Sequence, residues 1–305
     1  MTRFHELSVA RVTPETRDAL VVTFDVPPAS REAFRYVAGQ HLTLKAHIDG
    51  EEIRRSYSIC SSAQEQTLRV AIKRVDDGLF SNWAATHLKP GHRVEVMEPS
   101  GHFNVPLEPE SRRHHVAFAA GSGITPILSL IKTTLAAEPK SHFTLFYGNR
   151  ASSSVIFKDE LEDLKDQYLS RLNLVFILSR EQQDVDLFNG RIDAEKCAAL
   201  LQRWIDPSEI DVAYICGPQT MMEQVQASLL ASGVPKACIK LELFASGLNK
   251  EPRAARPGPV KGHEGAKVTV ILEGRTREFT LRKNETSLLD AALEQGIELP
   301  YACKG

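Results

Sequence analysis

The sequence predicts an antiparallel β-barrel followed by a doubly wound α/β domain and a short, incomplete third unit. Short runs of alternating apolar and polar residues, separated by turn residues, fill the first part of the chain, and longer apolar runs alternating with amphipathic helical stretches fill the second. A segment rich in proline, glycine and basic residues precedes the last part. The 305 residues suffice for two domains and part of a third. We therefore expect a barrel at 1–110, an α/β domain at 111–244, a linker at 245–266 and a C-terminal segment at 267–305.

The composition excludes several classes of protein. Apolar residues make up 42% and charged residues 25% of the chain, which is typical of a globular protein and not of a disordered or collagen-like one. Lys and Arg total 37 against 39 Asp and Glu, so the net charge of -2 argues against a nucleic-acid partner. The sequence has no run of apolar residues long enough for a membrane helix and no signal-peptide pattern. We expect a soluble, cytoplasmic protein.

Six strands and one helix are predicted in the first domain. The alternation in Leu42–Ala46 is typical of a strand with one buried face, and short strands at this spacing predict a small antiparallel barrel. The strands are expected at Leu7–Thr13, Ala19–Val26, His41–Ile48, Ile53–Ile59, Leu68–Arg74 and Arg93–Met97, and the helix at Ser81–Leu88.

Five apolar strands and four helices are predicted in the second domain. Apolar strands between amphipathic helices indicate a parallel sheet covered on both faces, and ligands bind such sheets beyond the carboxyl ends of the strands. The strands are expected at His115–Ala120, Phe143–Tyr147, Leu172–Leu178, Val212–Cys216 and Ile239–Leu243, and the helices at Pro126–Ala137, Val155–Asp166, Ala194–Trp204 and Thr220–Ala231. The C-terminal segment is expected to hold a hairpin, Val268–Leu272 with Thr276–Leu281, and a helix, Ser287–Gln295.

The strongest single motif is the glycine turn between the first apolar strand and the first helix of the second domain, Ala119-Ala120-Gly121-Ser122-Gly123-Ile124-Thr125-Pro126. Gly121 and Gly123 allow a tight turn whose backbone N–H groups approach a phosphate, and the helix N-terminus attracts the anion. Pro126 suits the first helical turn. A third glycine of the common dinucleotide fingerprint is missing, which favours a different type of dinucleotide site. An ordinary strand–helix turn is the alternative.

Two barrel motifs suit a bound nucleotide. In Arg55-Ser56-Tyr57-Ser58, the arginine can clamp a pyrophosphate, the tyrosine ring can stack on a flat heterocycle and a serine hydroxyl can bond its edge. Lys73 and the turn Gly78-Leu79-Phe80-Ser81 form a possible second phosphate cradle. The alternatives are a polar strand end for the first motif and a plain helix N-cap for Ser81.

Three further groups follow strands at the expected binding edge of the α/β domain. Arg150 follows Tyr147-Gly148-Asn149, and Ser179-Arg180 follows the next strand. Two arginines there can hold a ribose 2′-phosphate or can simply be exposed and solvated. Cys216-Gly217-Pro218 closes another strand, and Cys216 taken alone is better explained as a buried core residue.

In their order along the chain, these motifs resemble those of the ferredoxin-NADP reductase superfamily. The shared patterns are R-x-Y-S, G-x-x-S, G-x-G-x-x-P, C-G-P and, at Glu242-Leu243-Phe244, E-x-F. A reductase followed by a ferredoxin segment resembles the reductases of multicomponent oxygenases. This chain resembles one of these reductases especially closely. The resemblance lies in the runs Phe4-His5, Gly39–Ala46, Glu95–Met97, Gly101–Phe103 and Asp290–Leu293.

The resemblance implies an FAD site in the barrel. Arg55 would bind the FAD pyrophosphate, Tyr57 would stack on the isoalloxazine, and Ser58 would lie at the flavin edge that receives hydride. Ser81 and the backbone after Gly78 would hold the FAD phosphates, with Lys73 among the cofactor-binding residues. Glu242 and Phe244 would border the flavin.

The resemblance also implies a nicotinamide nucleotide site in the α/β domain. Gly121 and Gly123 would take the pyrophosphate and Thr125 would steer the nicotinamide. Cys216, with Gly217 and Pro218, would line the gap crossed by hydride. Arg150 and Arg180 favour NADPH over NADH, as does the lack of an acidic residue at the end of the second strand, and Ser179 is expected among the cofactor-binding residues.

The C-terminal tail resembles the start of a plant-type ferredoxin cluster loop, which places Cys303 as the first [2Fe–2S] ligand. The other three ligands would lie beyond Gly305, so we expect a truncated β-grasp segment that assembles no cluster as written. A stray terminal thiol is the alternative. The other cysteines, Cys60, Cys197, Cys216 and Cys238, form no C-x-x-C pair and predict neither a disulfide framework nor a zinc site.

The implied reaction passes electrons from NADPH through FAD to the iron–sulfur cluster, because a flavin can link a two-electron donor to a one-electron acceptor. The expected partner is the oxygenase component of a multisubunit complex. The alternatives are a different ring oxygenase or a haem protein as acceptor, and, more remotely, a non-catalytic electron-transfer or scaffold subunit. The intact Thr125 and Cys216-Gly217-Pro218 argue against the last of these.

Overall fold

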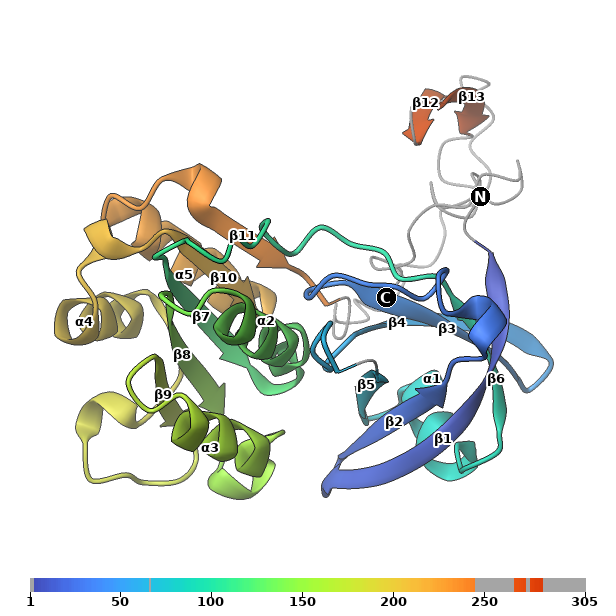
Figure 1. Cartoon of the computed structure of the whole chain (residues 1–305), viewed down its shortest axis with the longest axis horizontal. Helices are drawn as coiled ribbons and strands as arrows, with labels where there is room; N and C mark the ends of the chain where they lie inside the picture. Colours follow the sequence, from blue (N-terminus) through green and yellow to red (C-terminus); the bar gives the residue numbers. More distant parts are fainter. Residues whose placement is uncertain (1–2, 66, 245–265, 273–274, 282–305) are drawn as a thin grey trace, which may run out of the picture. The chain divides into compact units, whose positions relative to one another are not determined.

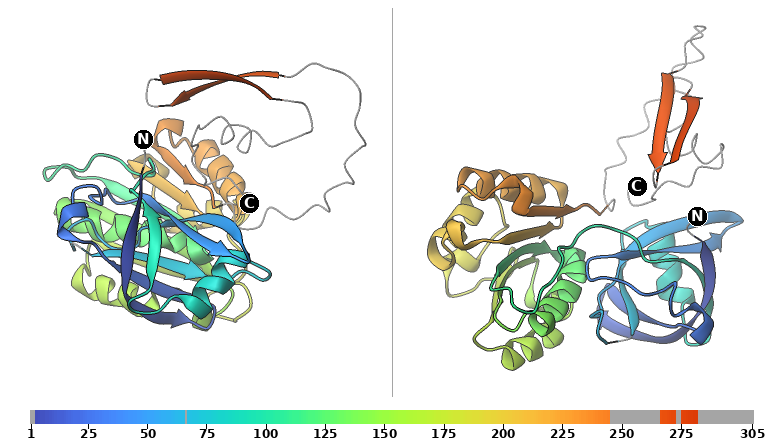
Figure 2. Two further views of the ribbon diagram at one scale, coloured as in Figure 1. Left: turned by 90° about the vertical axis from the view of Figure 1, so that its right-hand side faces the viewer. Right: turned by 45° about the horizontal axis from the view of Figure 1, so that its top comes forward.

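The computed structural model describes residues 3–65, 67–244, 266–272 and 275–281. The chain divides into two compact units, 1–244 and 245–305. The first unit contains an antiparallel barrel and a parallel-sheet α/β domain (Figures 1 and 2), which confirms the predicted fold class. The expected linker lies outside the described residues except for Ala266, which begins a strand.

Six antiparallel strands form the barrel, in the order β4-β3-β6-β1-β2-β5. Just after β4, Ile59 bridges to Val70 of β5, and the Cys60 N–H donates to the Arg69 carbonyl at 2.9 Å, which brings the two edge strands together. The elements are β1 Phe4–Thr16, β2 Ala19–Asp25, β3 His41–Ile48, β4 Glu51–Ser58, β5 Leu68–Lys73, α1 Leu79–His87 and β6 Arg93–Met97.

The α/β domain has five parallel strands in the order β11-β10-β7-β8-β9. Helices α2 and α3 supply core residues on one face of the sheet, and α4 and α5 supply them on the other. The strand order reverses between β7 and β10, the position at which such sheets open a ligand crevice. The elements are β7 His114–Ala120, α2 Ile124–Ala137, β8 His142–Asn149, α3 Lys158–Gln167, β9 Leu172–Leu178, α4 Ala194–Trp204, β10 Val212–Cys216, α5 Gln219–Ala231 and β11 Ile239–Glu242.

Helix α3 begins three residues later than the sequence predicts. Phe157 has a left-handed backbone with φ of 61°, which a helix interior does not accept. Its N–H donates to the Glu15 carboxylate of the barrel at 2.6 Å, and its ring is buried in the core beneath the sheet. This contact with the barrel keeps Val155–Phe157 out of the helix, so α3 begins at Lys158 and not at Val155.

The described part of the second unit is an antiparallel hairpin, β12 Ala266–Leu272 with β13 Arg275–Leu281. The predicted helix Ser287–Gln295 lies outside the described residues. Among the helices that the structure describes, none combines the length and apolar character needed to cross a bilayer.

Candidate functional site

The glycine turn after β7 lies where the strand order reverses between β7 and β10. Gly121–Gly123 form a short 3-10 turn that runs directly into α2, and Gly121 has a left-handed φ of 53°. A Cβ atom on Gly123 would lie 2.1 Å from the Cys216 carbonyl oxygen. Only glycine allows this approach, so the phosphate turn and the Cys216-Gly217-Pro218 turn are in direct backbone contact.

Side chains from three elements hold or flank this turn. The Tyr147 hydroxyl, from β8, donates to the Gly121 carbonyl at 2.9 Å, and the buried Thr125 hydroxyl donates to the Ser122 carbonyl at 3.0 Å. From the barrel strand β5, the Lys73 ammonium lies 3.8 Å from the position of a Cβ on Gly121. Lys73 therefore supplies a positive charge beside the turn of the other domain.

The barrel residues gather around β4 and the start of α1. The Tyr57 ring lies 5.8 Å from the Phe80 ring, and burial raises the pKa of its phenol, so the phenol stays neutral. The Ser81 hydroxyl accepts from the Val75 N–H at 3.1 Å and makes no N-cap bond to the helix. A Cβ on Gly78 would lie 2.5 Å from the Ser81 Oγ, so this loop also depends on glycine.

A buried cluster connects the barrel to the α/β domain. Ser58 pairs with His41 across β3 and β4, and the His41 Nδ1 lies 3.9 Å from the Glu242 Oε1. Glu242 in turn pairs with Cys216 across β11 and β10. The structure thus brings together Ser58 and Cys216, the residues expected on the flavin and nicotinamide sides, through His41 and Glu242.

Burial sets the charges in this cluster. Desolvation raises the pKa of Glu242 to about 7 and lowers that of His41. Burial, followed by the charge of Glu242, raises the pKa of the Cys216 thiol well above its ordinary value. The imidazole and thiol are therefore uncharged at neutral pH, which excludes a thiolate nucleophile. No group of three or more metal-ligating side chains occurs in the described ranges.

These residues fit a flavin. The Ser58 hydroxyl and the His41 Nδ1 are buried without a hydrogen-bond partner among the described residues, so both can bond the polar edge of a ring system. Tyr57, the preceding residue of the strand, offers a half-buried ring as a stacking surface, and Arg55 on the same strand carries a charge that suits a pyrophosphate.

The two candidate arginines for a 2′-phosphate lie side by side. Beyond the strand ends, the Arg180 N–H donates to the Arg150 carbonyl at 2.8 Å, and the Ser179 N–H donates to the Asn149 carbonyl at 2.9 Å. Both arginine side chains are exposed. The next residue, Glu181, accepts from the Ser152 N–H and hydroxyl, which ties the two loops together.

The remaining expected site residues lie near the same strand ends or outside the described residues. A Cβ on Gly217 would lie 3.2 Å from the Ala120 Cβ, so Gly217 packs closely on the end of β7. Pro218 is the residue before α5. Phe244 packs against the core cluster that contains Cys216. Cys303 lies outside the described residues.

Two residues of the site, His41 and Tyr147, have no role that the sequence predicts. Tyr147 stands in the motif before Arg150, but an apolar strand residue gives no sign that its hydroxyl bonds a distant turn. His41 follows Gly39-Gln40 in a run quoted for the resemblance, and only the register of β3 with β4 places it beside Ser58.

Three family models match the chain. An oxidoreductase FAD-binding domain matches residues 6–105, an oxidoreductase NAD-binding domain matches 118–227, and a 2Fe-2S iron-sulfur cluster binding domain matches 270–305.

Known proteins match over the whole chain or over its first unit. The chain is 48% identical to a subunit of the 1,2-phenylacetyl-CoA epoxidase of Escherichia coli (strain K12), over 100% of this chain and 85% of that protein. The reductase of this epoxidase is the protein that the runs quoted above resemble. The chain is 35% identical to the ferredoxin reductase component of 3-ketosteroid-9-alpha-monooxygenase from Rhodococcus rhodochrous, over 98% of this chain and 82% of that protein.

A solved structure shares the fold of the first unit. The crystal structure of a ferredoxin NADP+ reductase from Neisseria gonorrhoeae with bound FAD and NADP matches with a TM-score of 0.64 and 21% identity, over 79% of this chain and 98% of that one. The expected family resemblance is confirmed. The chain belongs to the ferredoxin-NADP reductase superfamily, as an FAD- and NAD-binding oxidoreductase related to the reductase components of oxygenase systems.

Proposed function

We propose that this protein takes electrons from NADPH and passes them through FAD and a [2Fe–2S] cluster to the oxygenase component of a phenylacetyl-CoA epoxidase. The acceptor is supported by the 48% identity to a component of the Escherichia coli epoxidase over the full chain. The protein would act in the cytoplasm, within a multisubunit complex. A more distant relative is a component of a steroid monooxygenase, so another oxygenase is the competing acceptor.

The observation that carries the proposal is the 3.9 Å approach of His41 to Glu242. It joins the Ser58 end of the barrel to the Cys216 end of the α/β sheet, so a flavin on one side and a nicotinamide on the other would meet at one water-poor cluster. FAD, when bound, supplies the ability to accept hydride and to release single electrons. The protein's own residues bind the two cofactors, orient their rings toward each other and exclude water from the space between them.

On the flavin side, Arg55 would hold the pyrophosphate and Tyr57 the ring face, while Ser58 would donate to the ring edge. Ser81 would shape the phosphate loop that begins at Gly78.

On the nucleotide side, Gly121 and Gly123 would expose backbone N–H groups to the pyrophosphate. Lys73 would add its charge there, and Thr125 would keep the turn closed under the nicotinamide. Cys216 would fill the gap between the rings as a neutral thiol, bordered by Glu242 and Phe244.

NADPH is preferred over NADH because Arg150 and Arg180 are adjacent and exposed beyond β8 and β9, with Ser179 directly before Arg180. A dianionic phosphate can accept charge-assisted bonds from both guanidinium groups.

The test is NADPH oxidation by the FAD-loaded protein carrying a complete, cluster-bearing [2Fe–2S] domain, in the presence of the purified oxygenase components of phenylacetyl-CoA epoxidase. We expect NADPH consumption that depends on phenylacetyl-CoA and yields the epoxidised thioester. A steroid 9-alpha-monooxygenase oxygenase serves as the matched acceptor. Equal coupling to both would contradict the assigned acceptor, and no reduction of the flavin by either nucleotide would contradict the reductase activity itself.

A further inference from the structure

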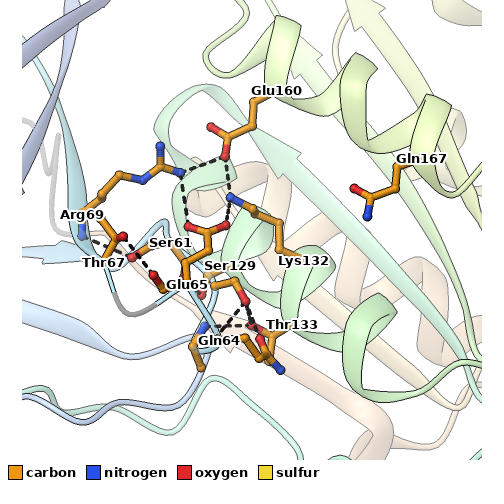
Figure 3. A network of polar contacts seen from close by, with 12 residues as sticks. Ser61, Gln64, Glu65, Thr67, Arg69, Ser129, Lys132, Thr133, Glu160 and Gln167 are labelled. Carbon is orange, nitrogen blue, oxygen red and sulfur yellow. Dashed lines mark hydrogen bonds and ion pairs between the residues drawn. The ribbon is translucent and has the colours of Figure 1, made fainter.

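Four charged side chains form an ion network between the barrel and the α/β domain (Figure 3). Arg69 of β5 and Glu65 of the preceding loop come from the barrel, whereas Lys132 of α2 and Glu160 of α3 come from the other domain. Glu160 accepts from Lys132 at 2.6 Å and from Arg69 at 2.8 Å. Glu65 pairs with Lys132 and lies 4.0 Å from Arg69. Each cation thus contacts both anions.

The network is sheltered from solvent. The side chains of Lys132 and Arg69 are 14% and 17% exposed, and those of Glu160 and Glu65 are 27% and 32% exposed. Burial raises the pKa of Glu160, but its bonds and charges from Lys132 and Arg69 outweigh this, so the pKa of that carboxyl is lowered overall. The two positive and two negative charges balance, so removal of one partner leaves a poorly solvated charge.

A buried layer of hydroxyl contacts lies next to the network on the same helix. The Ser129 hydroxyl donates to the Ser61 carbonyl at 2.6 Å, and the Ala63 N–H donates to the Thr133 Oγ1 at 3.3 Å. Ser129, Lys132 and Thr133 are spaced to share one face of α2. That face therefore contacts barrel residues 61–65 through both neutral and charged groups.

The same strand and the same helix carry the candidate nucleotide site at their other ends. Residues 69, 71 and 73 of β5 share one face of the strand because alternate side chains point the same way. Arg69 lies in the ion network, Ala71 is buried in the core cluster shared with α2, and Lys73 lies beside Gly121. Helix α2 begins directly after Gly123. The ion network thus joins α2, which follows the nucleotide turn, to β5, and β5 holds the segment directly after Ser58 through the Ile59–Val70 bridge and the bond from the Cys60 N–H to the Arg69 carbonyl.

We propose that Arg69, Lys132, Glu65 and Glu160 are positioning residues that set the distance between the nucleotide turn and the flavin side of the site. They contact no cofactor themselves. The inference rests on the proposed hydride transfer, in which a misplacement of about 1 Å can slow the reaction by about 100-fold.

The variants for the test are Lys132→Met and Glu160→Gln, with Lys132→Arg as the conservative variant. Lys158→Met is the matched control, because it removes one lysine charge from an exposed ion pair with Glu162 on α3. The first readout is backbone hydrogen exchange in the FAD-free full chain, followed in segments 61–65 and 129–133. The second is the rate constant of flavin reduction at saturating NADPH in the FAD-loaded chain, together with the FAD content.

We expect Lys132→Met and Glu160→Gln to raise exchange in those two segments and to slow flavin reduction by about 10- to 100-fold at unchanged FAD content. Lys132→Arg should restore most of the rate, and Lys158→Met should match the wild type. Wild-type rates in both network variants, or slowing that accompanies FAD loss and exchange throughout the barrel, would overturn the inference. Hydrogen exchange is measured without FAD, so it tests the positioning role of the ion network independently of the reductase function. If the proposed reductase function is wrong, the flavin of the wild-type protein itself stays oxidised when NADPH is added.

Discussion

Gly123 lies against the backbone of Cys216, so closely that a Cβ atom would come within 2.1 Å of the Cys216 carbonyl oxygen. Gly123 follows the end of β7 by three residues and Cys216 ends β10, and the strand order reverses between these neighbouring parallel strands. The contact therefore couples the turn expected to bind the nucleotide pyrophosphate to the turn expected to line the path of hydride.

Gly123→Ala should separate these turns. A methyl group cannot fit beside a backbone carbonyl without a shift, so we expect a loss of about 1–3 kcal/mol in the free energy of unfolding and much slower flavin reduction by NADPH. Thermal unfolding and stopped-flow reduction measure the two effects. Gly148→Ala is the control for stability, because its Cβ would meet the end of the Ile192 side chain at 3.3 Å, which can move. Equal stability of the two variants would argue against the contact.

Cys216→Ala should reduce hydride transfer more than dinucleotide binding. The thiol is buried and neutral, so its removal changes the shape of the gap without removing a charge from the nucleotide site. We expect kcat to fall by at least about 10-fold, or about 1.4 kcal/mol, with the dissociation constant of NADPH nearly unchanged. Cys197→Ala, at another fully buried cysteine, is the control. An increase in KM alone would show that the assigned role of Cys216 is wrong.

Arg150→Ala combined with Arg180→Ala should reverse or abolish the preference for NADPH. Each charge-assisted bond to a phosphate contributes about 1.5–3 kcal/mol, so kcat/KM for NADPH should fall by at least about 100-fold while that for NADH changes little. Steady-state reduction of ferricyanide with each nucleotide measures both. Arg203→Ala removes an exposed arginine from α4 of the same domain and serves as the control. Equal losses for the two nucleotides would remove the argument for a 2′-phosphate site.

We expect the buried carboxyl of Glu242 to lower the free energy of unfolding as pH rises. Its pKa increases from 4.5 to about 7 on folding because burial disfavours the charged carboxylate. Between these values the native state binds more protons than the unfolded state, so the stabilisation is complete below pH 4.5 and is lost as pH rises through 7. Between pH 4.5 and 7, we expect the free energy of unfolding of Glu242→Gln to rise by about 1–3 kcal/mol relative to that of the wild type.

Denaturant unfolding of both proteins in the same cofactor state, at several pH values, measures this difference. Glu223→Gln, at an exposed glutamate of α5, is the control and should follow the wild type. A difference between wild type and Glu242→Gln that stays constant with pH would contradict the buried, proton-binding carboxyl.

Local pattern was sufficient to predict much of the fold. The strands His41–Ile48, Leu172–Leu178 and Val212–Cys216 and the helix Ala194–Trp204 have the bounds that the sequence predicts. His41–Ile48 contains the apolar–polar alternation of a barrel strand, Leu172–Leu178 and Val212–Cys216 are short apolar runs in a sheet covered on both faces, and the apolar residues of Ala194–Trp204 recur with helical spacing.

Features that depend on contact between the domains could not be predicted. Helix α3 starts late because Phe157 bonds Glu15, which is 142 residues away in sequence. Lys73 precedes Gly78 by five residues, yet its ammonium lies beside Gly121 of the other domain. The site follows the same rule: motifs identified Ser58 and Cys216, whereas the His41–Glu242 approach between them depends on how two sheets meet.

Reduction of the bound flavin by a nicotinamide nucleotide is tested by the visible spectrum of the FAD-loaded chain under anaerobic conditions, recorded before and after addition of NADPH and, separately, of NADH. We expect a flavin absorption band that NADPH bleaches faster than NADH. A colourless protein that binds no added FAD, or a bound flavin that neither nucleotide bleaches, would contradict this expectation.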